Sequence, residues 1–213
     1  MKDLELNAVV KGFFEHKIID VSVDKPFVLA SGRESPVYID HRRIFSVPQL
    51  RKKVAHMWAQ KILETLRVPS DASLVVAGTA TAGIAPAYAL AEELNCRFVY
   101  VRSKPKDHGT AKIVEGVWTP GSKVIVVDDM VTTGGSLLDA VQKMREAQGQ
   151  VLFASSITRH AFPATLEKFK SQQLDLVSLF KTTDLFDTAY KLNLLGSKEL
   201  RAVMAWLAQW QSQ

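Results

Sequence analysis

The sequence predicts an α/β protein with a mainly parallel central sheet flanked by helices, and two observations carry that prediction. Short runs rich in β-branched residues alternate along the chain with longer segments in which apolar residues recur at helical spacing. Such alternation is typical of parallel sheets, because each helix returns the chain to the edge where the next strand begins. Ligands of these sheets bind at the carboxyl ends of the strands, so we expect the functional residues in the loops that follow strands.

The first third of the chain combines two helices with a small β element. Apolar residues recur every three or four positions in 4–16 and again in 48–66, which predicts a helix in each segment. Between them, short β-rich runs at 26–30 and 37–40 flank a turn made of Gly, Ser and Pro, and this pattern predicts a hairpin.

The remainder of the chain alternates strands and helices. We expect strands at residues 74–77, 97–101, 124–127, 151–157 and 174–180. Helices are expected at 84–94, 136–148 and 197–210. Gly149 closes the helix 136–148, because glycine readily adopts the left-handed conformation found after a helix.

Composition bounds the class of protein. The 213 residues, 47% of them apolar, suffice for one domain spanning 1–213. The net charge of +5 suits an anionic partner, but no long basic run predicts a nucleic-acid tail. Cys96 is the only cysteine, so we expect no disulfide framework and a reducing, cytoplasmic setting. We also expect no signal peptide and no membrane span.

The most informative segment is 124–136. A buried apolar strand precedes two adjacent carboxylates, Asp128 and Asp129, which are costly to bury without partners such as ribose hydroxyls or a metal. A turn follows, made of Thr132, Thr133, Gly134, Gly135 and Ser136. Its backbone N–H groups can converge at a helix N-terminus and bind a phosphate monoester. The plain structural alternative is an ordinary strand-to-helix turn capped by Ser136.

A second loop of small residues, 77–83, also follows a strand and opens a helix. It has the spacing of a P-loop, but Ile84 stands where a P-loop requires lysine, so a nucleoside triphosphatase is not predicted. Thr79, Ala80 and Thr81 could still present backbone N–H groups to a diphosphate. A simple βα turn remains the alternative.

A third segment concentrates positive charge within seven residues, at Arg102, Lys104, Lys106 and His108. Taken alone it is equally consistent with a solvated loop. Beside two candidate phosphate loops, it indicates a cationic arm that offsets the negative charge developing on a departing diphosphate and excludes water from the reacting centre.

Within the expected hairpin, Ser31, Gly32 and Arg33 form a polar turn, with Ser35 close by. Their hydroxyl and guanidinium groups suit a small planar acid. As structure alone, this is a well-formed turn with surface charge.

Taken in order, these four segments resemble the type I phosphoribosyltransferases and, within them, the orotate-specific enzymes. The resemblance covers about 27–136. Residues 124–136 are similar to the phosphoribosyl diphosphate signature, 27–38 to the orotate enzymes' N-terminal signature, and 102–109 to their flexible catalytic loop. It implies the type I phosphoribosyltransferase fold, with a small N-terminal hood at about residues 1–45.

The resemblance also implies an activity. Orotate and phosphoribosyl diphosphate would give orotidine 5′-monophosphate and pyrophosphate in pyrimidine synthesis. Mg²⁺ would be held mainly by the diphosphate and water, with Asp128 or Asp129 as further ligands. The family usually forms homodimers with shared active sites, in which the catalytic loop reaches the partner. We expect no nucleic-acid or membrane partner.

Residue roles follow from the same resemblance. The residues implied to act in catalysis are Arg102, Lys106, His108, Asp128 and Asp129. Thr132 to Ser136 would bind the ribose 5′-phosphate, with Thr132 also near orotate. Met130 and Val131 would be further substrate-binding residues. Ser31, Gly32, Arg33 and Tyr38 would bind orotate, and Arg159 is a further candidate for its carboxylate.

Two positions depart from the family pattern. Many relatives carry a second basic residue after the loop arginine, where this chain has Ser103, and Lys104 is the expected substitute. Many also have lysine where this chain has Ala30. These departures bear on the assignment of individual site residues more than on the activity.

Two rival functions follow from the same residues. One is a phosphoribosyltransferase acting on a purine or on xanthine, which the Ser31-Gly32-Arg33 turn disfavours. The other is a non-catalytic regulator that senses phosphoribosyl diphosphate and binds nucleic acid. A regulator would not need the cationic segment 102–109, and no helix-turn-helix or basic arm is evident. A second, decarboxylating domain is not expected at this length.

Overall fold

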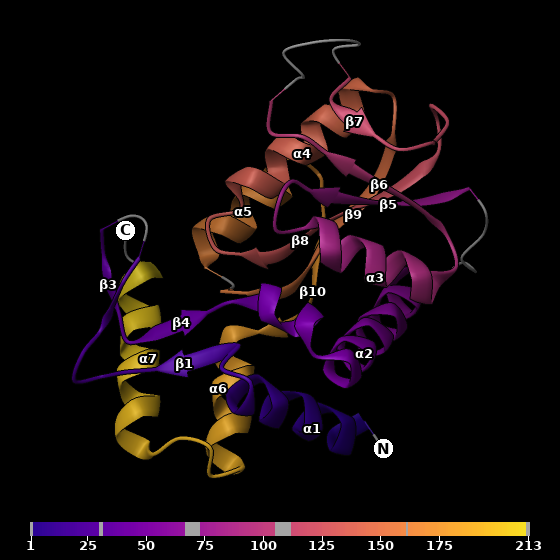
Figure 1. Cartoon of the computed structure of the whole chain (residues 1–213). Helices are drawn as coiled ribbons and strands as arrows, with labels where there is room; N and C mark the ends of the chain where they lie inside the picture. The colour runs from indigo at the N-terminus through magenta and orange to yellow at the C-terminus, as the bar shows by residue number, and fades with distance from the viewer. Residues whose placement is uncertain (1, 30–31, 67–72, 105–111, 161, 212–213) are drawn as a thin grey trace. The chain divides into compact units, whose positions relative to one another are not determined.

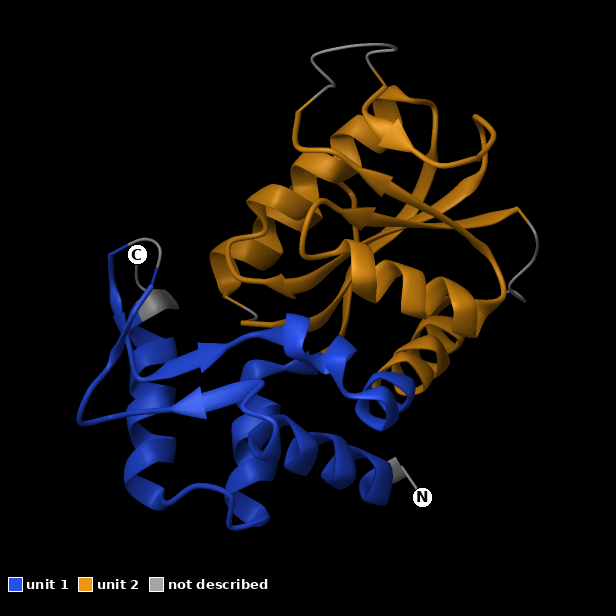
Figure 2. Cartoon of the chain, viewed as in Figure 1, with its two compact units in different colours: residues 1–53, 180–213 blue, residues 54–179 orange. Residues whose placement is uncertain are grey.

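A computed structural model of the chain describes residues 2–29, 32–66, 73–104, 112–160 and 162–211 (Figure 1). The chain divides into two compact units (Figure 2). One consists of residues 1–53 and 180–213, and the other of residues 54–179. Among the described residues, no helix is both long and apolar enough to cross a membrane.

The unit 54–179 is built on a six-stranded sheet with the order β10-β9-β8-β5-β6-β7 (Figure 1). Its strands are β5 (Leu74–Thr79), β6 (Arg97–Val101), β7 (Val114–Glu115), β8 (Lys123–Val131), β9 (Gln150–Arg159) and β10 (Leu176–Lys181), the last of which ends just beyond the unit. β5 pairs in parallel with β6 and β8, and β8 pairs in parallel with β9. The short β7 pairs antiparallel with β6. The predicted mainly parallel α/β sheet is therefore confirmed.

Helices pack against this sheet. They are α2 (Pro48–Leu66), α3 (Ile84–Leu94), α4 (Gly135–Glu146) and α5 (Pro163–Ser171). The bounds of α2, α3 and β6 match the predicted ranges, whereas α5 was not predicted. Successive β8 residues point to opposite faces, yet Val124, Ile125, Val126 and Val127 are all fully buried. The sheet is thus covered on both faces, as parallel sheets usually are.

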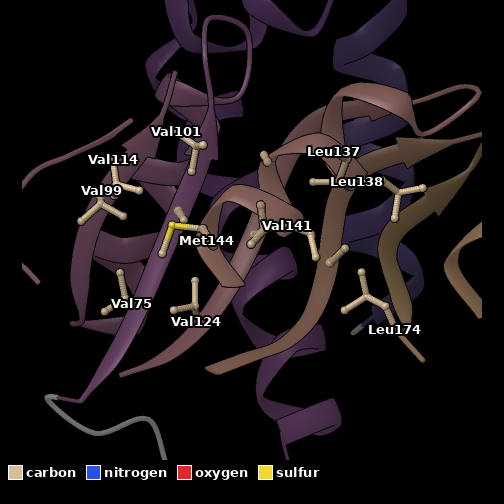
Figure 3. Close-up of a cluster of buried hydrophobic side chains, with 14 of the residues drawn as sticks. Val75, Val99, Val101, Val114, Val124, Leu137, Leu138, Val141, Met144 and Leu174 are labelled. Atoms are coloured by element: carbon tan, nitrogen blue, oxygen red, sulfur yellow. The ribbon is translucent and has the colours of Figure 1, made fainter. Parts of the chain in front are cut away.

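The core between α4 and the sheet consists mainly of aliphatic side chains. Figure 3 shows Leu137, Val141 and Met144 projecting from α4 among valines of the strands. Val75, Val99 and Val124 are fully buried members of this cluster. Because packing is close along the whole helix, the core fixes α4 relative to β8, the strand that precedes it.

The other unit joins the two ends of the chain. Its elements are α1 (Lys2–Glu15), β1 (Ile19–Val21), β2 (Phe27–Val28), β3 (Glu34–Ser35), β4 (Val37–Ile39), the 3₁₀ helix η1 (His41–Ser46), α6 (Thr182–Lys191) and α7 (Ser197–Gln211). α1 packs on α6, and α6 packs on α7. Residues 180–213 therefore belong to the same unit as the segment expected to form a hood. The description of 1–213 as one domain stays a prediction.

The predicted hairpin exists with a different second strand. β2 pairs with β3, not with residues 37–40. β4 instead pairs with β1, through Ile19↔Ile39 and Val21↔Val37. The shorter hairpin forms because Leu29 N–H donates to Arg33 O and Gly32 N–H donates back to Leu29 O, both at 2.8 Å. These bonds close the turn directly before β3.

Candidate active site

The candidate site lies where β8 extends beyond its pairing with β5. The β5–β8 ladder ends at Gly78↔Val127, whereas the β8–β9 ladder continues through Asp128↔Ser156 to Val131↔Arg159. The strand was predicted to end at Val127, and that boundary was wrong because β9 alone supports the last residues. Asp128 and Asp129 consequently lie within the strand, beyond the end of the β5–β8 ladder.

The carboxylate of Asp128 is held by two local donors. It is only 6% exposed. Its Oδ1 accepts the backbone N–H of Asp129 at 2.9 Å, and its Oδ2 accepts the Ser136 hydroxyl at 3.1 Å. Each oxygen therefore has a partner, which offsets the cost of burying the charge. Asp129 is less buried than Asp128 and lies beside it.

The turn after β8 has the geometry of an anion-binding helix N-terminus. Gly134 precedes α4 with φ +78°, and no side chain caps the helix there. The first turn of α4 carries no acidic residue. The N–H groups at the start of a helix have no intrahelical acceptors and a partial positive charge, so this end of α4 can bind a phosphate.

Gly134 is required in this turn for two reasons. Its left-handed φ is costly for other residues. A Cβ atom at this position would also lie 2.6 Å from Cε2 of Phe169, which projects from α5. At Gly135 a Cβ atom would meet nothing within 4 Å.

The second small-residue loop follows β5, so parallel pairing puts it at the same edge of the sheet. Ala80 N–H donates to Val101 O at 2.9 Å, and the peptide bond between Ala80 and Thr81 is cis. A Cβ atom on Gly83 would lie 2.8 Å from Val127 O and would also contact the Thr79 hydroxyl. Glycine thus lets this loop pack directly against the end of β8. Thr79 is buried, and Thr81 is exposed.

The described part of the cationic segment is anchored at its base. Arg102 N–H donates to Ile113 O at 2.9 Å, and Lys143 Nζ of α4 donates to Ser103 O at 2.8 Å and Arg102 O at 3.3 Å. Arg102 Nη1 lies 3.8 Å from Glu115 Oε1. The Arg102 side chain therefore faces a carboxylate of the protein in this structure, and an anionic ligand would compete with Glu115 for it.

Of the other three basic residues predicted in the cationic segment, the structure describes one. Lys104 is exposed beside the anchored base. Lys106 and His108 lie outside the described residues, so their predicted roles remain predictions.

The candidate orotate-binding residues belong to the unit that contains residues 1–53. Gly32 has φ +78°, and Arg33 is exposed. The Tyr38 ring is 38% exposed and lies 5.7 Å from the Phe27 ring. Ser31 lies outside the described residues. The Trp206 indole of α7 donates to Glu34 O at 3.1 Å, which ties the hairpin to the C-terminal helix.

Arg159 ends β9 and is opposite Val131 in the ladder. Its Nη1 donates to Leu176 O at 2.7 Å. Next to it, His160 N–H donates to Val131 O at 3.0 Å, and its ring lies 5.1 Å from the Phe162 ring. Burial lowers the pKa of His160 to about 4. His160 was not predicted, because a lone histidine after a strand carries no sequence signal.

Mg²⁺ prefers oxygen ligands and keeps several waters. Within the described ranges, no group of three or more His, Cys, Asp or Glu side chains is arranged to hold a metal. Asp128 and Asp129 supply oxygen atoms of the right kind, but Asp128 already accepts two hydrogen bonds. These residues fit an ion that takes most of its ligands from a substrate and water.

Known proteins resemble this chain over most of its length. A family model described as a phosphoribosyl transferase domain matches residues 41–168. An orotate phosphoribosyltransferase of Lactiplantibacillus plantarum is 37% identical, with 89% of this chain and 88% of that protein covered.

Two solved structures are similar in fold. Orotate phosphoribosyltransferase from Aeropyrum pernix has a TM-score of 0.70 and 30% identity, covering 88% of this chain and 99% of that one. Leishmania donovani UMP synthase has a TM-score of 0.77 and 25% identity, covering 96% of this chain and 42% of that one. The chain therefore spans less than half of the latter protein.

The glycine pair in the turn gives a direct test of its backbone geometry. Gly134→Ala is expected to lower the free energy of unfolding by about 1–3 kcal/mol, because alanine resists the left-handed φ and its Cβ meets Phe169. Gly135→Ala is the matched control and should not lower stability, because its Cβ meets nothing within 4 Å and alanine is favoured over glycine in a helix by up to about 1 kcal/mol. Urea unfolding without ligand measures both, and equal effects would contradict the assignment.

The buried His160 predicts a pH dependence of stability. Its folded pKa of about 4 lies below the ordinary value of 6.5. The unfolded chain therefore binds a proton between these values that the folded chain does not, so stability falls as pH drops from 6.5 toward 4. The contribution is on the order of 3 kcal/mol. His160→Gln should flatten this slope in urea unfolding across that range, whereas the exposed-site control His16→Gln should retain it.

Proposed function

Because the chain belongs to the phosphoribosyl transferase domain family, we propose that it transfers the 5-phosphoribosyl group from phosphoribosyl diphosphate to orotate. The products are orotidine 5′-monophosphate and pyrophosphate, and the reaction belongs to pyrimidine synthesis. The observation that carries the phosphoribosyl half is the N-terminus of α4, which has no side-chain cap and follows the turn after the acidic pair of β8. The similarity over most of the chain to orotate phosphoribosyltransferases supports orotate as the acceptor.

The β8 segment would bind the ribose 5′-phosphate. Backbone N–H groups of the turn 132–136 bind the phosphate, and Asp128 and Asp129 face the ribose hydroxyls. Met130 and Val131 complete this side of the site. The loop containing Thr79, Ala80 and Thr81 presents N–H groups to the diphosphate, since it lies at the same sheet edge.

The cationic segment would act on the leaving group. Orotate's ring nitrogen attacks the anomeric carbon as the carbon–oxygen bond to pyrophosphate breaks, with cleavage leading, and the proton of that nitrogen is released to the departing pyrophosphate or to water. Arg102, Lys106 and His108 offset the negative charge on the departing pyrophosphate, and Lys104 takes the place of the basic residue missing at Ser103. The acidic pair faces the cation-like ribose. Bound Mg²⁺ would supply further positive charge to the diphosphate.

Acceptor recognition is assigned to the hairpin. Ser31, Gly32, Arg33 and Tyr38 would read the planar acid, with Thr132 near the ring and Arg159 as a candidate for its carboxylate. We further propose a cytoplasmic homodimer in which the segment containing Lys106 and His108 reaches the partner's site. Sedimentation and the complementation of two inactive variants would test that assembly.

The activity is tested by mixing the protein with orotate, phosphoribosyl diphosphate and Mg²⁺ and following the ultraviolet absorbance of orotate. A decrease that requires both substrates is expected. Adenine, guanine, hypoxanthine and xanthine should neither react nor compete. Turnover of a purine instead of orotate would replace the acceptor, and absence of any turnover would defeat the proposal.

The role of the cationic segment is tested by Lys106→Ala. The expected result is a fall in kcat of about 100-fold or more, as for other donors that stabilise developing charge, with orotate affinity little changed. Lys170→Ala, at an exposed position on α5, is the control and should behave like wild type. Steady-state kinetics and orotate binding by calorimetry separate the two effects. Unchanged kcat would remove Lys106 from catalysis.

A further inference from the structure

Helix α5 packs against the turn 132–136, which we call the phosphate turn. Thr165, in the first turn of α5, is 3% exposed and donates its hydroxyl to Thr132 O at 2.9 Å. These two residues are 33 positions apart in the chain. A buried hydroxyl that donates across such a separation fixes one tertiary position of the turn.

This bond determines where the next backbone N–H points. The Thr132–Thr133 peptide is not among the cis bonds of the described chain. In a trans peptide, the C=O and the following N–H point in opposite directions. Because Thr132 O points to α5, the Thr133 N–H points away from α5. Thr133 is exposed, so this N–H lies on the side of the turn that α5 does not cover.

The same helix also packs against Gly134, on the side of the turn that faces α5. A Cβ atom on Gly134 would lie 2.6 Å from Phe169 Cε2 and 3.4 Å from Thr165 Cγ2. Both side chains are buried, at 1% and 3% exposure. The Thr165 hydroxyl thus donates to Thr132 O, and its methyl group packs against the turn at Gly134.

We propose that Thr165 is a positioning residue that sets the direction of the Thr133 N–H and thereby the affinity of the turn for a phosphate monoester. The inference rests on the proposed function, in which that phosphate is the 5′-phosphate of the substrate. Thr165 does not touch the substrate. It acts by holding the Thr132 carbonyl, so that the Thr133 N–H of the same peptide is available before the ligand arrives.

The matched pair Thr165→Val and Thr165→Ser separates the hydrogen bond from packing. Valine keeps the shape and loses the donor, and serine keeps the donor. Thr165→Val is expected to weaken ribose 5-phosphate binding about tenfold, the scale of one hydrogen bond to a charged group. KM for phosphoribosyl diphosphate should rise similarly. Calorimetry gives the affinity, and kinetics give KM and kcat.

The supporting result has a specific pattern. KM for orotate and kcat at saturation should stay within about threefold in both variants, and Thr165→Ser should bind ribose 5-phosphate within about threefold of wild type, since the estimated effect is confined to one hydrogen bond. A purely structural role would instead lower the melting temperature and the active fraction while leaving KM unchanged. Wild-type affinity in Thr165→Val, or equal losses in both variants, would overturn the proposal.

A measurement on the wild-type protein keeps the test decisive if Thr165→Val does not fold. Titration with ribose 5-phosphate, followed by amide NMR, should shift the Thr133 resonance strongly. An unmoved Thr133 amide in a protein that binds the ligand would overturn the inference alone. Failure of the wild type to bind both ribose 5-phosphate and phosphoribosyl diphosphate would remove the proposed function, and the inference with it.

Discussion

Strand β8 is paired in parallel on both sides, and the unequal length of those two ladders determines the rest of the candidate site. The β5–β8 ladder ends at Val127, while the β8–β9 ladder continues to Val131. The extension holds Asp128 where the Asp129 N–H and the Ser136 hydroxyl can each donate to one of its carboxylate oxygens. The Ser136 bond ties the start of α4 back to the strand. The acidic pair and the candidate anion-binding end of α4 are thus parts of one short, cross-linked segment.

Helix α4 links this segment to the cationic one. Its N-terminus faces the turn, and Lys143, two turns further along, holds the carbonyls of Arg102 and Ser103. Asp139 lies 2.5 Å from Lys143 Nζ and steadies it. The helix is itself fixed by its buried aliphatic face. The base of the cationic segment is therefore placed relative to the phosphate turn by one rigid element, which lowers the cost of orienting its charges.

The sequence predicted a candidate site but not the contacts that support it. Apolar periodicity was sufficient for α2 and α3, and the order of acids, hydroxyls and glycines predicted a site at 128–136. The length of β8 could not be predicted, because aspartates have low strand propensity and only pairing with β9 keeps them extended. The β1–β4 pairing involves three-residue strands, which are too short for a periodic signal. The Thr165 contact joins residues 33 positions apart, so no local sequence pattern predicts it.

The distribution of charge in the site matches the demands of the proposed reaction. The turn 132–136 contains no cationic residue, so the 5′-phosphate would be bound by neutral N–H and hydroxyl donors. That phosphate keeps its charge throughout the reaction, and stronger binding to it would stabilise the ground state and the transition state alike. The departing diphosphate gains negative charge as the bond breaks. In the proposed reaction, cations in the segment 102–108 would stabilise the group whose negative charge increases, and such stabilisation raises the rate.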